Sequence, residues 1–148
     1  MEITIDKENI MKAVEMNVSI IARSMKDADG NSLYDKVRIQ ERDHDLLERF
    51  MIPVVGELTK VMRDFVTGTE SDKITVELDG RRNEVFEQTL QSLCTSFVEN
   101  RIACEWLKLK AVEYAEIYSG NAQGILDQIR VKVYHKDIPE MKFYGEEE

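Results

Sequence analysis

The sequence predicts a mainly α-helical protein, an antiparallel four-helix bundle of long helices with a small β element at one end. Two observations lead to this fold class. Apolar residues recur at steps of three and four along most of the chain, and only two prolines and seven glycines interrupt its 148 residues. Side chains three or four residues apart lie on one side of a helix, so each such stripe predicts a helix with one buried face. The length fits one helical domain over residues 1–148.

The charge of the chain limits its classes of partner. Twenty Lys and Arg stand against 29 Asp and Glu, which gives a formal net charge of −9. Phosphate contacts need clustered cations, so we expect no general nucleic-acid binding. The N-terminus lacks a basic segment followed by an apolar one, and no apolar run approaches the roughly 20 residues that span a bilayer. We therefore expect a cytoplasmic location without membrane contact.

The chain begins with a predicted strand and a predicted helix. Residues 2–5 alternate polar and apolar, which favours a short strand. Asp6 suits the N-cap of a helix that runs to about Asp27, because its carboxylate can accept a backbone N–H of the first turn. That helix is expected to stop at residues 27–31, where Gly30 tolerates the left-handed backbone of a helix end.

Two short motifs resemble metal-binding sites, and each has a simpler explanation. Residues 27–31 open like a calcium loop, but the twelfth position holds Arg38, where the loop requires a bidentate Glu. Glu41 and His44 form one Glu-x-x-His, whereas di-iron bundles use two, and His135 has Lys in the corresponding place. We expect a helix-ending turn and a solvated first helical turn, and no bound metal.

The middle of the chain predicts a second helix. Residues 33–40 are ambiguous and are interpreted as an extended or irregular connector. Asp43 or Asp45 can then cap a helix with an apolar stripe, in which Pro53 removes one backbone donor and predicts a kink just before it. The glycine-containing segment 67–69 is expected to end this helix.

The clearest predicted strand leads into the longest predicted helix. Residues 73–78 alternate apolar and polar and are followed by an Asp-Gly turn. Residues 82–118 contain no Gly and no Pro and are interpreted as one unbroken helix, about 55 Å long. Its apolar stripe comprises Phe86, Leu90, Leu93, Phe97, Cys104, Leu107, Ala111, Tyr114 and Tyr118.

The surface of this long helix carries the main functional expectation. Asn100 stands where the stripe predicts an apolar residue; it either fixes register or oligomeric state, or points outward because the stripe drifts. A second apolar row lies on the flank of the helix. A face that wide indicates contacts beyond one chain, hence self-association. The candidate oligomer or partner interface consists of Asn100, Trp106, Leu109 and Val112.

The residues for covalent chemistry are few. Cys94 and Cys104 lie ten residues apart, about 15 Å along a helix, and a disulfide needs Cα atoms within about 7 Å, so they cannot pair with each other. They are interpreted as buried apolar groups in a reducing compartment. Neither has a neighbouring His, and the sequence has no nucleophile elbow and no glycine-rich phosphate loop. We expect no enzyme and no cofactor.

The last segment fits either a strand or a helix. Ile129, Val131 and Val133 alternate like a strand, but a helix over residues 122–136 explains more apolar positions and is preferred. It would begin after the Ser-Gly-Asn sequence at 119–121, and residues 141–144 could add a strand to the small β element.

Two basic groups stand out from the acidic background. They contact a partner, or they solvate the surface and complement a helix C-terminus. The first is Arg81 with Arg82. The second, the candidate basic partner contact, consists of Arg130, Lys132, His135 and Lys136.

A resemblance adds a biological setting. The residues that carry it are Trp106-Leu107-Lys108, Ala115, Tyr118, Ala122, Leu126, Ile129 and Tyr134-His135-Lys136 before Pro139, together with Leu33-Tyr34-Asp35-Lys36-Val37, Asp43 and Phe50. With these residues the chain resembles small helical proteins of phages and prophages from gut Bacteroidales. The resemblance implies virion assembly as a head–tail connector or tail-completion component that works as a ring. It implies the host cytoplasm or the virion as location, and it carries over no catalytic residue.

The sequence therefore predicts a non-catalytic assembly protein that acts as a homo-oligomer through helix faces, with itself and other assembly proteins as partners. Two alternatives come from other classes. One is a small metal-binding helical enzyme that uses Glu41 and His44. The other is a regulator or inhibitor of a host protein, whose acidic surface would mimic nucleic acid.

Overall fold

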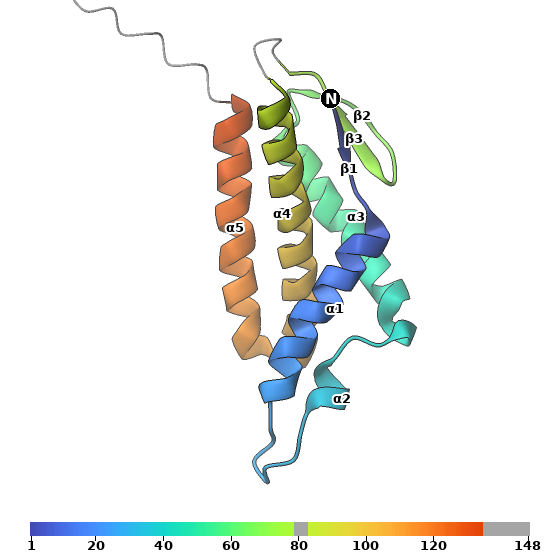
Figure 1. Cartoon of the computed structure of the whole chain (residues 1–148), viewed down its shortest axis with the longest axis vertical. Coiled ribbons are helices and arrows are strands. Elements are labelled where there is room, and N and C mark those ends of the chain that lie inside the picture. The colour runs from blue at the N-terminus through green and yellow to red at the C-terminus, as the bar shows by residue number, and fades with distance from the viewer. Residues whose placement is uncertain (79–82, 135–148) are drawn as a thin grey trace, which may run out of the picture.

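The computed structural model describes residues 1–78 and 83–134, and this part of the chain is mainly helical. Four helices of 18 to 27 residues carry a three-stranded sheet at one end (Figure 1). The elements are β1 (Glu2–Thr4), α1 (Lys7–Ser24), α2 (Tyr34–Val37), the short 3₁₀ helix η1 (Glu41–Asp43), α3 (His44–Val61), β2 (Val66–Thr69), β3 (Lys73–Val76), α4 (Glu84–Lys110) and α5 (Val112–Tyr134).

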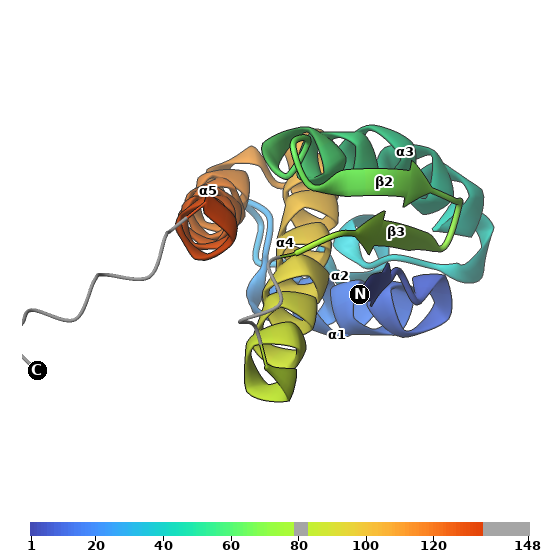
Figure 2. The ribbon, with the colours of Figure 1, turned by 90° about the horizontal axis from the view of Figure 1, so that it is seen from above.

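Helix α4 is the central element. Helices α1, α3 and α5 all pack against it, and α5 packs almost entirely against α4. Figure 2 shows α5 on the opposite side of α4 from β2 and β3. Ile102, Ala103 and Cys104 are consecutive and all buried; three consecutive residues cover about 200° of a helix, so neighbours enclose α4 on more than one side. The expected arrangement of an antiparallel four-helix bundle is not confirmed.

The prediction of one helix over residues 82–118 is wrong. The chain leaves the helix at Ala111, whose backbone angles are φ −157° and ψ 70°, and α5 then runs back along α4. The Ala111 side chain is buried, so the apolar stripe continues through the break and its spacing does not reveal it. Residues 119–121, expected to end the helix, lie inside α5. The preference for a helix in the last segment is confirmed as far as Tyr134.

The sheet is partly the predicted one. Its order is β1-β3-β2 with antiparallel pairing, and Ile3 lies opposite Ile74. Strands were expected at 2–5 and 73–78, and both are present in shorter form. The third strand is β2, where the sequence predicted only a helix end; its residues from Thr67 to Thr69 are exposed and show no alternation. The predicted strand at 141–144 lies outside the described residues.

The helix ends of the N-terminal half follow their sequence signals. The Asp6 carboxylate accepts the N–H of Asn9 at 3.2 Å, as expected of an N-cap. Helix α1 ends at Ser24, earlier than predicted, and the Asp27 carboxylate accepts the N–H groups of Asp29 and Asn31. The N–H of Asn31 lowers the pKa of Asp27. These contacts confirm the expected turn.

The connector and α3 also differ in detail from the prediction. Residues 33–40 include the one-turn helix α2, and Val37 and Ile39 are buried, so this segment belongs to the core. Helix α3 continues through Pro53 from His44 to Val61. The kink expected before Pro53 stays a prediction.

Candidate functional site

Trp106 was predicted to lie on an interaction surface, and this prediction is wrong. Its side chain is 1% exposed, and its indole N–H donates to the carbonyl of Val37 at 2.8 Å. The ammonium group of Lys110 lies 5.3 Å from the ring centroid. Trp106 therefore ties α4 to the connector around α2. Trp106 lies off the main apolar stripe because α4 has a second buried side, which packs within the same chain.

The other three candidate interface residues do not form one surface. Asn100 and Leu109 are nine residues apart, about two and a half turns, so they lie on opposite sides of α4. Leu109 and Val112 are 62% and 65% exposed and flank the break between α4 and α5. The half-buried Asn100 donates its amide to the carbonyl of Ser96 at 2.8 Å. Of the four predicted interface residues, only Leu109 and Val112 form an exposed apolar surface, which we call the apolar corner.

Helix α5 carries a more coherent surface, whose middle borders the groove between α5 and α4. One line of its exposed positions at alternating steps of four and three is uncharged, although a third of the residues in the chain are charged. The neighbouring line of the same spacing carries Glu116, Asp127 and Arg130. Ile117 and Val131, at its two ends, are 59% and 63% exposed. Steps of four and three keep residues on one line of a helix and are the repeat of a coiled-coil contact. We name this line the α5 seam; it consists of Ile117, Asn121, Gly124, Gln128 and Val131.

Two glycines make the middle of this surface hollow. Gly120 and Gly124 lie inside α5, and a Cβ atom added to either would meet none of the atoms that the structure describes within 4 Å. Each costs a helix about 1 kcal/mol relative to Ala. A hollow of about 410 Å³ is lined here by residues of both helices: Asn100, Gly120, Asn121, Gly124, Ile125 and Gln128. Packing within the described chain therefore gives no reason for either glycine.

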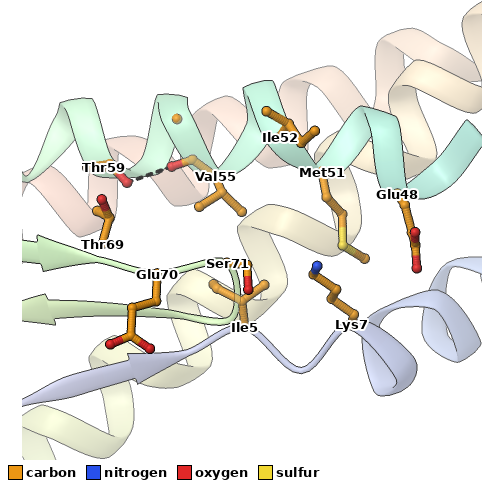
Figure 3. Close-up of a pocket in the computed structure, with 11 residues that line it drawn as sticks. Ile5, Lys7, Glu48, Met51, Ile52, Val55, Thr59, Thr69, Glu70 and Ser71 are labelled. Atoms are coloured by element: carbon orange, nitrogen blue, oxygen red, sulfur yellow. Dashed lines mark hydrogen bonds between the residues drawn. The ribbon is translucent and has the colours of Figure 1, made fainter.

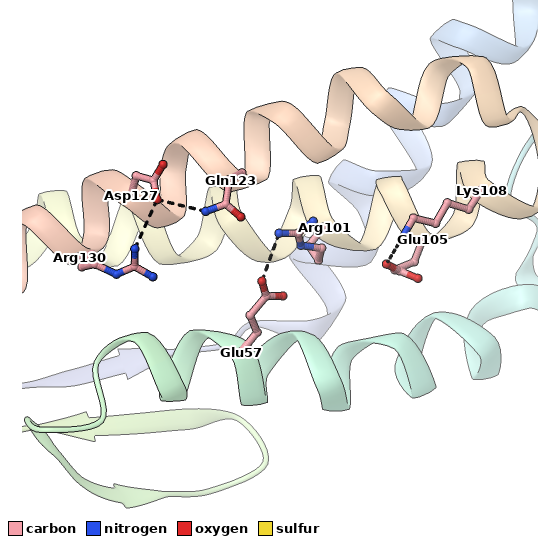
Figure 4. A network of polar contacts seen from close by, with 7 residues as sticks. All are labelled: Glu57, Arg101, Glu105, Lys108, Gln123, Asp127 and Arg130. Carbon is pink, nitrogen blue, oxygen red and sulfur yellow. Dashed lines mark hydrogen bonds and ion pairs between the residues drawn. The ribbon is translucent and has the colours of Figure 1, made fainter.

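The predicted basic contact lies elsewhere on α5. Arg130 lines a cleft of about 640 Å³ between α3 and α5, where its guanidinium lies 3.7 Å from the Asp127 carboxylate (Figure 4). Lys132 faces α4, with its ammonium 5.0 Å from the ring centroid of Phe86. The structure thus turns these two cations toward different neighbours. His135 and Lys136 lie outside the described residues, as do Arg81 and Arg82.

Two carboxylates that line this cleft, Glu57 and Asp64, have partners. Arg101, whose side chain is 13% exposed, reaches from α4 to the carboxylate of Glu57 on α3 at 3.2 Å. The Tyr134 hydroxyl donates to the Asp64 carboxylate at 3.0 Å. The Arg101 Nε atom is buried and has no hydrogen-bond partner among the described residues. Cations and carboxylates alternate along the cleft, which makes it a polar contact between helices.

An apolar groove of about 560 Å³ lies between α3, the turn after β2 and the segment that joins β1 to α1 (Figure 3). Ile5, Met51 and Val55 form its aliphatic wall, and Lys7 extends toward Met51. Two glutamates, Glu48 and Glu70, stand at its rim. The residues that line it include no His and no Cys. The groove can accept an aliphatic group, but it offers no nucleophile–base pair.

The titratable groups singled out in the sequence are engaged or buried. The His44 ring contacts the carboxylate of Glu15, which joins the start of α3 to α1. Cys94 and Cys104 are free thiols enclosed in α4, and burial raises the pKa of Cys94 to about 12. Over residues 1–78 and 83–134, no three His, Cys, Asp or Glu side chains gather as metal ligands.

No described helix is long and apolar enough to cross a membrane. Comparison of the protein with family models, curated proteins and solved structures finds no match. The α5 seam is therefore taken as the candidate functional site on the chemistry of its own residues. Sequence reasoning missed it because the helix was expected to end at residues 119–121, in the middle of the seam. The steps of four and three between Ile117 and Val131 would have found it.

Proposed function

We propose that this protein is a non-catalytic assembly protein that works as a homo-oligomer, joined through the α5 seam. One observation carries the proposal: a line of exposed residues along α5, the seam from Ile117 to Val131, carries no charge. Two copies with a net charge of −9 each repel one another, so an uncharged surface is where they can approach most closely. Exposed apolar residues at its two ends supply the favourable burial.

The biological setting of the proposal comes from the resemblance to phage and prophage proteins. We place the oligomer in virion assembly, as a head–tail connector or tail-completion component, with other assembly proteins as further partners. It would act in the host cytoplasm or in the virion. The uncharged seam supports the self-association, and the resemblance alone supports the setting.

Sedimentation equilibrium from low to high micromolar concentration tests the self-association. The wild-type protein should form a concentration-dependent oligomer. Ile117→Glu should weaken association by at least about a hundredfold, because a charge would enter the contact in each copy. Ile20→Glu is the matched control, since Ile20 is an isoleucine of α1 with 61% exposure against 59% for Ile117. It should associate like the wild type.

A second pair of variants separates the α5 seam from the apolar corner. Val131→Glu changes the far end of the seam, and Val112→Glu changes the corner, at 63% and 65% exposure. The proposal requires that Val131→Glu dissociates the oligomer and that Val112→Glu does not. The reverse result would move the contact to the corner. A wild-type protein that stays monomeric at high micromolar concentration would overturn the proposed function.

A further inference from the structure

Strand β1 forms one edge of the three-stranded sheet, and its pairing shows which of its backbone groups point outward. The carbonyl of Met1 accepts the N–H of Val76 at 2.9 Å. Four residues further on, Ile5 donates its N–H to the carbonyl of Asp72 at 2.6 Å. Residues that bond the neighbouring strand alternate with residues that do not. The N–H and carbonyl of Thr4 therefore point away from β3, where a strand of another molecule could pair with them.

The side chain of Gln91, in the first half of α4, occupies this outer side of β1. Its Oε1 atom accepts the N–H of Thr4 at 2.8 Å, and its Nε2 atom donates to the carbonyl of Thr4 at 2.9 Å. A carboxamide offers the same donor and acceptor as a peptide unit. An antiparallel strand beside β1 would exchange the same two bonds with Thr4. Gln91 thus takes the place of a neighbouring strand at this residue.

The half-buried Gln91 carboxamide is held in this orientation by α4 itself. Its Nε2 atom also donates to the hydroxyl of Thr95, one turn further along the helix, at 3.1 Å. The reversed amide would set its NH₂ group against the N–H of Thr4 and its oxygen against the carbonyl, so both bonds would be lost. The contact joins residues that are 87 positions apart in the sequence. The fold of a single chain therefore makes it, and no second molecule is needed.

The rest of the sheet carries other features that oppose pairing with a further strand. The other outward-pointing residue of β1, Glu2, is exposed and charged, and charged side chains on an edge disfavour strand addition. At the opposite edge, β2 pairs with β3 through a bulge between Val66 and Gly68. A bulge bends the strand and disturbs the regular spacing of its outer backbone groups. The contact of Gln91 with Thr4 is thus one of several features that oppose strand addition.

We infer that Gln91 closes the β1 edge of the sheet to strand addition, so that the protein does not associate through its sheet. The partner that it excludes is an extended strand, including β1 of a second copy of this chain. It excludes that strand by occupying the backbone groups that the strand would bind. The inference does not involve the α5 seam and does not depend on the proposed function.

Amide hydrogen exchange of Thr4 tests the contact. Gln91→Ala should raise the exchange rate of the Thr4 N–H by about tenfold, the effect of one net hydrogen bond. Gln88→Ala is the matched control, because Gln88 lies three residues earlier on α4 and donates to the Glu84 carboxylate instead. It should leave this rate unchanged. Gln91→Glu retains an acceptor for the Thr4 N–H and should exchange more slowly than Gln91→Ala. Exchange in Gln91→Ala at the wild-type rate, or in Gln91→Glu at the rate of Gln91→Ala, would overturn the inference.

Self-association tests the closure itself. Both glutamine variants are made in a chain that carries Ile117→Glu, so that a contact through the α5 seam does not contribute. In sedimentation at high micromolar concentration, Gln91→Ala should associate at least about tenfold more tightly than Gln88→Ala. Its oligomer should show the infrared band of intermolecular β-sheet, and the Thr4 N–H should be protected again within it. Urea unfolding of both variants first identifies conditions in which each is fully folded.

The outcomes separate this inference from the proposed function. If Gln91→Ala associates no more than Gln88→Ala, Gln91 does not close the edge. Association of Gln91→Ala without renewed protection of Thr4 would place the contact elsewhere and would also overturn the inference. Neither result bears on the α5 seam, because both variants lack it. A wild-type protein that stays monomeric would overturn the proposed function and leave the comparison of Gln91→Ala with Gln88→Ala unaffected.

Discussion

Helices α4 and α5 are antiparallel neighbours of similar length, 27 and 23 residues, but their surroundings differ. The middle of α4 is enclosed by α1, α3, α5 and the connector at α2. Helix α5 has one buried side, formed by residues such as Ala122 and Ile129, and an exposed surface that carries the uncharged seam beside charged residues such as Asp127. The apolar residues of α4 are thus buried within the fold, whereas the uncharged residues of the α5 seam are exposed.

The difference shows which sequence feature indicates an assembly surface. The wide apolar face of α4 predicted self-association, but the fold itself covers much of that face, with Trp106 as the best example, and leaves Leu109 and Val112 exposed. On α5 the informative feature is one exposed line without charge, the seam from Ile117 to Val131. The outer side of an exposed helix in an acidic protein is expected to carry charges, as Glu116, Asp127 and Arg130 do on the neighbouring line. Burial within the described chain does not account for their absence from the seam.

The largest expected effect tests the enclosure of α4. Trp106→Ala should lower the free energy of unfolding by about 3–5 kcal/mol, because it removes a fully buried aromatic side chain and leaves a cavity. Urea unfolding followed by circular dichroism measures this free energy, because the variant has no tryptophan whose fluorescence could be followed. Leu109→Ala, at an exposed position of the same helix, is the control and should change stability by less than about 0.5 kcal/mol. Equal effects of the two substitutions would contradict the enclosure.

An effect of intermediate size tests the α5 seam. One substitution there should stabilise the monomer and weaken self-association. Gly124→Ala should raise the unfolding free energy of the monomer by about 1 kcal/mol, because alanine favours the helix and its methyl group meets no described atom. Under the proposed function the same methyl group should weaken self-association, because it adds a side chain in the middle of the α5 seam. Urea unfolding at submicromolar concentration and sedimentation at high concentration give the two quantities.

The control for this prediction is Gly56→Ala. Gly56 is also a helical glycine with no described atom within 4 Å of an added Cβ, but it lies on α3. It should stabilise the monomer by a similar amount and leave association unchanged. If both variants associate alike, a contact between copies at Gly124 is wrong.

The smallest expected effect concerns a carboxylate at the edge of the enclosed part of α4. Burial raises the pKa of Glu99 above its ordinary value. Because the folded pKa exceeds the unfolded one, the associated stability is fully present below the unfolded pKa and is lost as the pH rises through the folded pKa. Glu99→Gln should therefore stabilise the protein at pH 7, by less than about 1 kcal/mol for a half-exposed group.

The pH dependence distinguishes this cause from a general effect of removing charge. The gain from Glu99→Gln should shrink when urea unfolding is measured at pH 4. Glu48→Gln, at an exposed position of α3, removes the same charge and should give no comparable gain at pH 7. A gain from Glu99→Gln that stays constant between the two pH values would contradict burial as the cause.

Features that depend on contacts between residues close in the sequence were predicted better than those that depend on distant segments. The Asp6 cap and the turn at Asp27 were predicted correctly because each depends on hydrogen bonds within five residues. Strand β2 was missed because its exposed residues pair with β3 without any pattern of their own. The α5 seam was missed for a related reason. Its first part contains Ser-Gly-Asn at residues 119–121, a sequence that locally suits a helix end. In the structure the helix is continuous there and packs against α4.

The helical class, the burial of Cys94 and Cys104, the helical last segment and the positions of two strands could all be predicted from the sequence. These properties depend on spacing and composition, which act locally along the chain. The reversal of the chain at Ala111, the burial of Trp106 and the exposure of the α5 seam depend on packing between distant segments and were not predictable. Helical periodicity states which residues share a side. It does not state which other element covers that side, because that depends on contacts between segments far apart in the chain.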